Sequence, residues 1–302
     1  MKATTMLDTI RSLLGVPACA IPLSVCKPAK GYLLDKAGIP ETGTAVLFAV
    51  PYLVTSDVDD PTRNLSLYAV PRDYHGYMKE LASTVLPYLR ECFPAFSFAL
   101  FADHAPICEV DAAARAGLGV VGMNGLLITR DYGSFVFLGE IVTSADYAAV
   151  TGSSAPTFPG DPPCCEGCGA CTEACPAGCC GVDRISCLSA LTQKKGALTP
   201  EEEVSIRQNG LVWGCDTCQV ACPHNIRLIR EGRDTAIPYF AEHRMPYLDR
   251  RQLAAMSDEA LASRAYAWRG RPVILRNIDL LEEQWIRDKE DFNDSAERSQ
   301  EP

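Results

Sequence analysis

Seven of the fifteen cysteines of this chain form two short runs, and each run ends in Cys-Pro. The first run has the spacing C-x2-C-x2-C-x3-C-P and consists of Cys165, Cys168, Cys171 and Cys175, followed by Pro176. This spacing wraps an iron-sulfur cubane in bacterial two-cluster ferredoxins. The second run, Cys215, Cys218 and Cys222 followed by Pro223, is one cysteine short, and Cys187 is the natural substitute.

We expect two [4Fe-4S] clusters that exchange their fourth ligands. In the ferredoxin pattern the last cysteine of a run binds the other cluster, which holds the two cubes close together and suits electron transfer. One cluster is then assigned to Cys165, Cys168, Cys171 and Cys222, and the other to Cys175, Cys187, Cys215 and Cys218. Zinc is the alternative, because two C-x2-C pairs also make a four-thiolate site, but zinc needs no exchanged Cys-Pro runs. Cys164, Cys179 and Cys180 are left over and are expected not to bind metal.

Length and composition argue against a disulfide scaffold. Such scaffolds are usually short secreted chains, whereas this chain has 302 residues, enough to bury its own core without covalent help. Asp8 and Arg11 interrupt the N-terminal apolar run, and no stretch reaches about 18 apolar residues. We therefore expect a cytoplasmic protein with no membrane partner. The formal net charge of -10 argues weakly against a polyanionic partner.

The sequence pattern divides the chain into three parts. Residues 1–155 alternate β-rich runs with helical stretches, which predicts an α/β domain. Its strands are expected in 18–23, 44–54, 96–102, 126–129 and 135–143, and an amphipathic helix in 74–92. Residues 156–280 are expected to form a ferredoxin-like two-cluster domain, with eleven of the fifteen cysteines, that continues into arginine-rich helices. Residues 281–302 are mostly charged or polar and are expected to form a flexible tail.

Four stretches carry a resemblance to a known family. "RISCLSALTQKKG" and "LVWGCDTCQVACPHN" resemble the cluster domain of the epoxyqueuosine reductases, and "YAVPRDYHGYM" and "DHAPICEVDAAARAGLGVVGMNGLLITRDYGSFVFLGEIVT" are similar to their corrinoid-binding half. The resemblance, over roughly residues 40–230, implies a cobalamin-dependent oxidoreductase that reduces epoxyqueuosine, free or in tRNA, to queuosine. It also implies a base-off cobalamin between the α/β domain and the clusters, and an external electron donor such as ferredoxin or flavodoxin. We expect a short form without the family's C-terminal helical repeats.

The same resemblance implies a set of site residues. The family's proton donor falls on Asp103, for which a strand-end cap is the alternative interpretation. A carboxyl that a flat corrin partly desolvates can keep its proton near neutral pH. Cofactor contacts are expected from Asp73, Tyr74, His75, Gly117, Gly119, Gly122 and Asn124, although a simple tight turn also explains the glycines. Their G-x-G-x-x-G spacing does not favour a nicotinamide site, because no strand clearly precedes it and the acidic residue at the expected distance, Glu140, lies in an apolar run.

The chain also departs from the family's pattern. Met123, Leu67 and Pro71 stand where the family usually has lysine, arginine and glycine, which leaves the substrate side of the pocket open. A corrinoid reductive dehalogenase has the same cofactor set and is the alternative enzyme class. A two-cluster electron-transfer protein, in which Asp103 has no role, is the non-enzymatic alternative.

Residues 227–276 carry ten arginines against six acidic residues. This local excess either meets an RNA backbone or forms ion pairs within the protein, and we expect the ion pairs. Trp268 and Tyr266 either stack on a base or pack in the core, and we expect the core.

Overall fold

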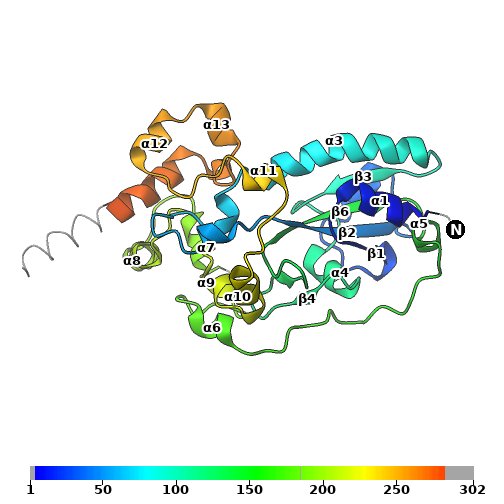
Figure 1. Ribbon diagram of the computed structural model, residues 1–302, viewed down its shortest axis with the longest axis horizontal. Coiled ribbons are helices and arrows are strands. Elements are labelled where there is room, and N and C mark those ends of the chain that lie inside the picture. The colour runs from blue at the N-terminus through cyan, green and yellow to red at the C-terminus, as the bar shows by residue number, and fades with distance from the viewer. Residues whose placement is uncertain (1–3, 184, 283–302) are drawn as a thin grey trace, which may run out of the picture.

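A four-stranded sheet forms the centre of the N-terminal half. The structure is a computed structural model that describes residues 4–183 and 185–282. The strands lie in the order β1-β2-β6-β3 (Figure 1). They are β1 (Ala18–Pro22), β2 (Thr44–Pro51), β6 (Val136–Thr143) and β3 (Phe98–Phe101). The expected alternation with helices is present, but each neighbouring pair is antiparallel because the connections reverse the chain direction. The half is therefore α+β rather than a parallel α/β domain.

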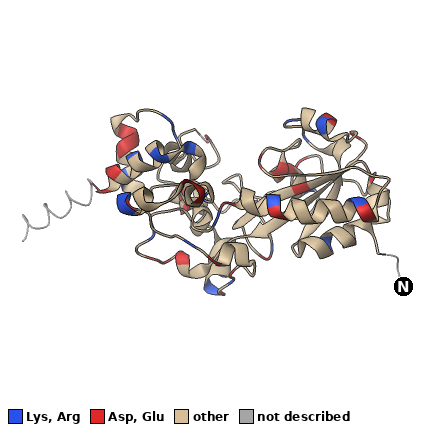
Figure 2. Cartoon of the chain, turned by 90° about the horizontal axis from the view of Figure 1, so that it is seen from above, with Lys and Arg blue, Asp and Glu red and all other residues tan. Residues whose placement is uncertain are grey.

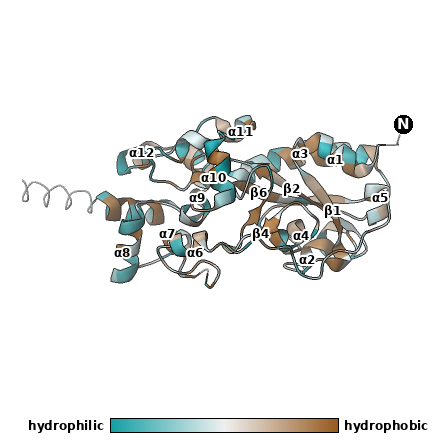
Figure 3. Ribbon diagram, turned by 60° about the horizontal axis from the view of Figure 1, so that its bottom comes forward, coloured by the Kyte–Doolittle hydropathy of each residue, from teal (hydrophilic) through white to brown (hydrophobic). Residues whose placement is uncertain are grey.

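Strand β2 is buried along its whole length, so both faces of the sheet are covered. Val46 and Phe48 point to one hydrophobic cluster, and Leu47 and Ala49 to another, as the two-residue period of a strand requires. The first cluster is covered by α1 (Met6–Leu14), α3 (Tyr74–Cys92) and α5 (Tyr147–Thr151), and the second by α2 (Tyr32–Ala37) and α4 (Glu109–Arg115). Figure 3 shows the hydrophobic strands enclosed between these helices.

A small hairpin pairs β4 (Val120–Val121) with β5 (Leu127–Ile128). The sequence predicts β5 but misses β4, a two-residue strand directly after glycines. The other four predicted strands each contain an observed one, and the predicted helix 74–92 coincides with α3. Val121 also pairs through its backbone with Cys164, so the hairpin connects the N-terminal half to the first cysteine run.

The C-terminal half is helical. Its helices are α6 (Ala170–Ala174), α7 (Leu188–Thr192), α8 (Pro200–Asn209), α9 (Thr217–Val220), α10 (Pro223–Arg230), α11 (Pro238–Ala241), α12 (Arg250–Ala255), α13 (Asp258–Ala262) and a last one over 271–282. The chain also forms short 3-10 turns. Three precede α3, namely η1 (Leu23–Val25), η2 (Thr55–Asp57) and η3 (Leu67–Ala69), and η4 (Ala267–Arg269) lies in the C-terminal half. No helix among the described residues is both long enough and apolar enough to cross a bilayer. Of the predicted tail, residues 283–302 lie outside the described residues.

The helical half has a hydrophobic core of its own, and part of that core comes from the N-terminal half. Trp213 and Tyr266 are fully buried there, beside Leu65, Ala69 and Val70 from the connection between β2 and α3. The boundary at residue 155 remains a prediction. The packing shows that this connection belongs to the helical core.

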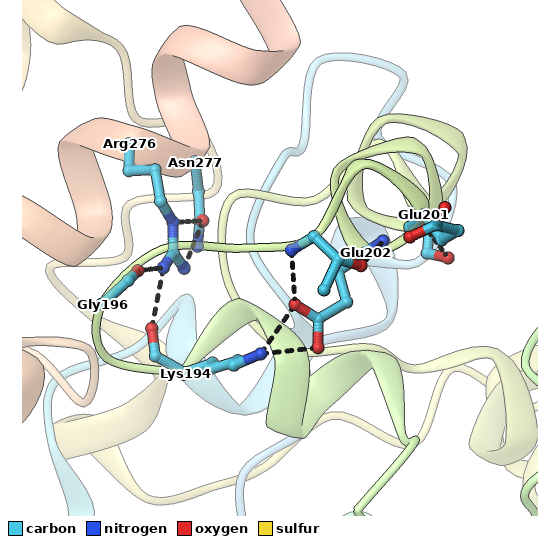
Figure 4. Close-up of polar contacts among 8 residues, drawn as sticks. Lys194, Gly196, Glu201, Glu202, Arg276 and Asn277 are labelled. Atoms are coloured by element: carbon cyan, nitrogen blue, oxygen red, sulfur yellow. Dashed lines mark hydrogen bonds and ion pairs between the residues drawn. The ribbon is translucent and has the colours of Figure 1, made fainter.

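Polar contacts fasten the last helix to the turn before α8 (Figure 4). Arg276 donates from Nη1 to the carbonyl oxygens of Lys194 at 2.8 Å and Gly196 at 2.9 Å, and from Nη2 to Asn277 Oδ1 at 2.9 Å. The Lys194 ammonium binds both carboxylate oxygens of Glu202 at 2.7 Å. The segment that follows α7 is thereby held against the last helix.

The arginine-rich segment pairs within the protein, as expected. The pairs include Arg227–Glu231, Arg244–Asp57, Arg250–Asp279 and Arg271–Asp258. Figure 2 shows basic and acidic residues interspersed over the helical half, on the left of the view. Much of the local positive charge is therefore balanced by acidic side chains of the same chain.

Candidate active site

A cavity of about 630 Å³ lies where the first residues of β6, an inner strand of the sheet, meet the helical half. Its size is that of a site for a drug-sized or larger ligand. One wall consists of Val136, Phe137 and Leu138 of β6 and of Leu126 and Leu127 at β5. The helical half contributes Gln193, Ala265 and Trp268.

Trp268 corrects one prediction. Its side chain is 60% exposed and lines the cavity, whereas Tyr266 is buried in the core as expected. The guanidinium of Arg269 lies 3.6 Å from the centre of the Trp268 ring. Trp268 therefore lies on the wall of the cavity and not in the core.

Asp103 lies on the cavity wall two residues after the end of β3, in a left-handed backbone conformation with φ of 59°. Few residues other than glycine adopt this conformation, and those that do are concentrated at functional sites. The Tyr74 hydroxyl donates a hydrogen bond to Asp103 Oδ2. His75 Nε2 lies 3.6 Å from the same oxygen, and His75 Nδ1 lies 2.9 Å from Asp73 Oδ1. The structure thus brings together four of the predicted site residues, with Asp73 as the N-cap of α3.

Stacked rings hold Tyr74 in place. Its ring stacks on that of Phe137 with centroids 4.2 Å apart and planes 11° apart, and His75 packs on it at 4.2 Å. Offset stacking of this kind fixes ring orientation as well as burying area. The hydroxyl that meets Asp103 is therefore carried on an immobilised ring.

The pKa of Asp103 is raised, first by burial and then by the nearby Asp73 carboxylate, while Lys30 opposes the shift. The Asp103 side chain is still 61% exposed. The pKa is therefore raised by partial burial against the protein, not by full enclosure of the carboxyl group. The sequence does not single out a second acid, Glu109, whose Oε1 accepts a hydrogen bond from the Asp103 N–H at 3.3 Å. Burial and Asp103 raise the pKa of Glu109 to about 7.

The two predicted sets of cysteines line two separate pockets. Cys165, Cys168, Cys171 and Cys222 line one of about 310 Å³. Cys175, Cys187, Cys215 and Cys218 line another of about 290 Å³. Met123 and Asn124 contribute to the walls of both. In the described ranges, no three His, Cys, Asp or Glu side chains converge as the ligands of a single metal ion do.

The leftover cysteines differ in position. Cys179 and Cys180 lie on the wall of the second pocket, and Cys179 Sγ is 3.6 Å from Cys175 Sγ. Cys164 is exposed. The second pocket therefore offers six thiols for the four that a cubane needs.

A buried polar network joins the second cysteine run to the cavity. Asn225 at the start of α10 donates to Ser134 Oγ at 2.8 Å and accepts from the Ser134 N–H at 2.9 Å. Gln219 of α9 donates to the Ser134 carbonyl at 2.9 Å and to the Tyr52 hydroxyl at 3.3 Å. Since Ser134 lines the cavity, the network sets the position of the run relative to the cavity wall.

Four of the predicted cofactor contacts do not line this cavity. Gly117 lines a smaller one beside Arg11, and Asn124 lies between the cysteine pockets. Gly119 and Gly122 allow close packing in the hairpin, because a Cβ would lie 2.4 Å from the Ile128 carbonyl oxygen and 2.5 Å from Asn124 Oδ1 respectively.

The three departures from the family pattern also lie off this cavity. Leu67 and Pro71 are buried. Met123 is 41% exposed, between the two cysteine pockets.

Comparison with known proteins gives consistent relatives. The chain is 34% identical over 229 residues to an epoxyqueuosine reductase of Gloeobacter violaceus, which is 73% of this chain and 68% of that protein. The epoxyqueuosine reductase of Lactococcus garvieae is 32% identical over 68% of this chain and 57% of its own length. That of Escherichia coli is 35% identical over 53% of this chain and 41% of its own length. The chain thus spans about half the length of several curated relatives. No family model matches it.

Solved structures share the fold. An epoxyqueuosine reductase from Streptococcus thermophilus matches with a TM-score of 0.69 at 21% identity, over 91% of this chain and 79% of that one. An epoxyqueuosine reductase in complex with an epoxyqueuosine-modified tRNA-Tyr stem loop matches with a TM-score of 0.67 at 23% identity, over 91% and 79%. At these identities the likeness establishes the fold.

Proposed function

Since the chain belongs to the epoxyqueuosine reductase family, a family of oxidoreductases, we propose that it removes the epoxide oxygen of epoxyqueuosine to give queuosine. The observation that supports this most is the arrangement of Asp103. An acid with a raised pKa lines a large cavity, and the second cysteine run is joined to the wall of that cavity. The curated relatives favour this reaction over reductive dehalogenation.

The residues of the two cysteine pockets fit [4Fe-4S] clusters. The first pocket presents four thiols from the two Cys-Pro runs and has His224 on its wall, and the second presents three thiols from these runs together with Cys187, Cys179 and Cys180. We propose Cys165, Cys168, Cys171 and Cys222 for one cluster and Cys175, Cys187, Cys215 and Cys218 for the other. Electrons from an external donor such as ferredoxin or flavodoxin then have a route toward the cavity.

The cavity itself fits a large, flat, mainly apolar ligand. Val136, Phe137 and Leu138 form an apolar wall, and the polar groups of Asp73, Tyr74 and His75 gather at one edge. We propose that these residues hold the corrin ring of a base-off cobalamin. When bound, the cobalamin supplies a strongly reducing cobalt centre.

The protein's own part in the reaction is the supply and placement of protons. Converting an epoxide to an alkene and water takes up two electrons and two protons. Because the Tyr74 hydroxyl donates to Asp103 Oδ2, Oδ1 is the oxygen that carries the proton toward the cavity. We propose that Asp103 gives this proton to the departing epoxide oxygen, and that Tyr74 and His75 keep the carboxyl aimed at the substrate.

The substrate is proposed as epoxyqueuosine in a tRNA stem loop or as the free nucleoside. A relative with this fold binds an epoxyqueuosine-modified tRNA stem loop. Trp268, beside Arg269 at the cavity, offers a face on which a base can stack.

The test is turnover by anaerobically purified protein with a reduced electron donor, followed by mass as the loss of one oxygen. Epoxyqueuosine is supplied as nucleoside and in a stem loop. We expect about eight irons and eight sulfides per chain, one bound corrin, and queuosine from at least one substrate form. Full clusters without corrin would instead indicate an electron carrier. Two zinc ions and no iron would overturn the cluster assignment.

A further inference from the structure

Two arginines beside the large cavity, Arg72 and Arg264, have no acidic partner. Each is followed in the chain by a residue of the cavity wall, Arg72 by Asp73 and Arg264 by Ala265. In the part of the chain that the structure describes, neither guanidinium forms an ion pair, unlike Arg244 of the same helical half. The proposed mechanism leaves both without a role.

The backbone places the two arginines directly opposite each other. Arg72 and Arg264 form an isolated antiparallel bridge, and the Asp73 N–H donates to the Ser263 carbonyl oxygen at 2.8 Å. This bond joins the residues that flank the bridge, so the two arginines are a non-hydrogen-bonded pair, in which the side chains lie closest. Like charges at such positions are destabilising. The pair therefore costs stability in the free protein unless an anion lies between the two cations.

The donors of Arg72 are unoccupied. Its Nε is buried without a hydrogen-bond partner, and its other N–H groups donate to no described residue. The guanidinium carbon lies 3.9 Å from the centre of the Tyr239 ring, and the Tyr239 hydroxyl donates to the Asp73 carbonyl oxygen at 2.9 Å. The ring is thus fixed beside the start of α3, and the guanidinium rests on it with its donors available to a ligand.

Arg264 is almost as free. Among the described residues its guanidinium makes one hydrogen bond, from Nη1 to the Val70 carbonyl oxygen at the long distance of 3.3 Å. Burial lowers the pKa of Arg264, and the charge of Arg72 lowers it too, as expected of neighbouring cations.

The acids on this side of the cavity do not neutralise the pair. Asp73 Oδ1 accepts from the His75 N–H at 3.1 Å and lies 2.9 Å from His75 Nδ1. Glu80 of α3 is exposed, and within the described ranges it forms no ion pair. Two adjacent guanidinium groups that lack an acceptor are suited to an anion with several oxygens.

We propose that Arg72 and Arg264 bind a phosphodiester of the molecule that occupies the cavity. This rests on the proposed function, because a phosphodiester is the one acidic group that either proposed occupant carries. It belongs to the backbone beside the modified nucleotide in an RNA substrate, and to the nucleotide loop in a cobalamin. In both cases its two free oxygens accept from the two guanidinium groups, and its charge offsets their repulsion.

The first experiment measures RNA binding without turnover. A fluorescein-labelled tRNA-Tyr stem loop is titrated with wild type, Arg72→Ala, Arg264→Ala and Arg251→Ala at several salt concentrations. If the phosphodiester is that of RNA, Arg72→Ala and Arg264→Ala should each bind about 10- to 100-fold more weakly. The slope of log K against log salt should become shallower by about 0.7 in each. Arg251→Ala, at an exposed position of α12, should bind as the wild type does.

The second experiment measures corrin binding to the same proteins by absorption. Hydroxocobalamin is compared with cobinamide, which has the same ring but lacks the nucleotide and its phosphodiester. If the phosphodiester is that of the cofactor, Arg72→Ala and Arg264→Ala should bind hydroxocobalamin about 10- to 100-fold more weakly. Both should bind cobinamide as the wild type does.

Arg72→Lys separates a bidentate contact from a bare charge. Lysine keeps the charge but loses the planar fork, so affinity for the probe that the site binds should fall while the salt slope stays. Each alanine variant removes one of two like charges and breaks no ion pair, so both should melt close to the wild type.

The two probes together decide the proposal. Weaker binding of the stem loop alone assigns the site to RNA, and weaker binding of hydroxocobalamin alone assigns it to the cofactor. Variants that bind both probes as the wild type does, or a wild type that binds neither, overturn it. Equal losses for hydroxocobalamin and cobinamide also overturn it, since the arginines would then hold the ring. If the wild type binds a probe but converts no epoxyqueuosine, the proposed function fails while the binding measurements still decide the site.

Discussion

Replacing Arg63 by methionine should destabilise the protein strongly, because it breaks a buried ion pair beside the second cysteine run. Arg63 Nη1 lies 2.7 Å from Asp216 Oδ2, and the two side chains are only 12% and 4% exposed. Asp216 stands next to Cys215 and accepts from the Leu67 N–H at 3.0 Å with both oxygens. Arg63→Met leaves this buried carboxylate without its cation, and removing one partner of such a pair costs about 3–5 kcal/mol.

The loss should depend on pH in a known direction. Burial raises the pKa of Asp216 and Arg63 opposes this, so the variant's Asp216 has a still higher folded pKa. The pKa of Asp216 is about 3.9 in the unfolded chain and higher in the folded variant. At any pH between these two pKa values, folding of the variant takes up a proton. Its stability should therefore fall as pH rises through that window, and its deficit relative to wild type should be larger at pH 8 than at pH 5.

Anaerobic urea unfolding measures both effects, with the fluorescence of the buried Trp213 as the probe. Arg251→Met, at an exposed arginine, should stay within about 0.5 kcal/mol of wild type. The double variant Arg63→Met/Asp216→Asn should recover much of the deficit, because position 216 then carries no charge that needs a partner. A deficit below about 1 kcal/mol, or one that does not change between pH 5 and 8, refutes the reasoning.

Two further pairs of substitutions test other parts of the structure. Cys187→Ala should lose or convert one cluster and leave the other, whereas Cys179→Ala should keep both, and iron content and EPR measure the difference. Two intact clusters in Cys187→Ala would mean that another thiol of that pocket is the ligand. Gly133→Ala should lower the melting temperature far more than Gly232→Ala, because both glycines have positive φ but only at Gly133 does a Cβ meet Asn225 Oδ1, at 2.0 Å. Equal losses in the two glycine variants would show that Asn225 yields at little cost.

The cysteine sets were predictable because ligand spacing is a local property of the chain. Short gaps in a Cys-Pro run leave little freedom in where the thiols point, and the two predicted sets do line separate pockets. The strands other than β4 were predictable for the same reason, since β-branched and aromatic runs extend over several residues. Whether each set binds a cluster remains a prediction.

What the sequence could not show depends on contacts between distant segments. The antiparallel strand order and the packing of Leu65 beside Trp213 arise from tertiary pairing. The exposure of Trp268 follows from where the helical half meets the sheet, so the prediction that Trp268 packs in the core was wrong. Glu109 opens α4 only six residues after Asp103, but the left-handed turn that joins them leaves no signal in the sequence.

The most direct test of the account is single turnover of epoxyqueuosine by Asp103→Asn against wild type, with corrin, iron and sulfide measured on the same samples. Asparagine tolerates the left-handed backbone that position 103 adopts, so the fold and the cofactor content should be unchanged. An amide cannot deliver the proton that lets the epoxide oxygen depart, and we predict a rate about 10²- to 10⁴-fold lower. A wild-type rate in a fully loaded Asp103→Asn protein would contradict the account.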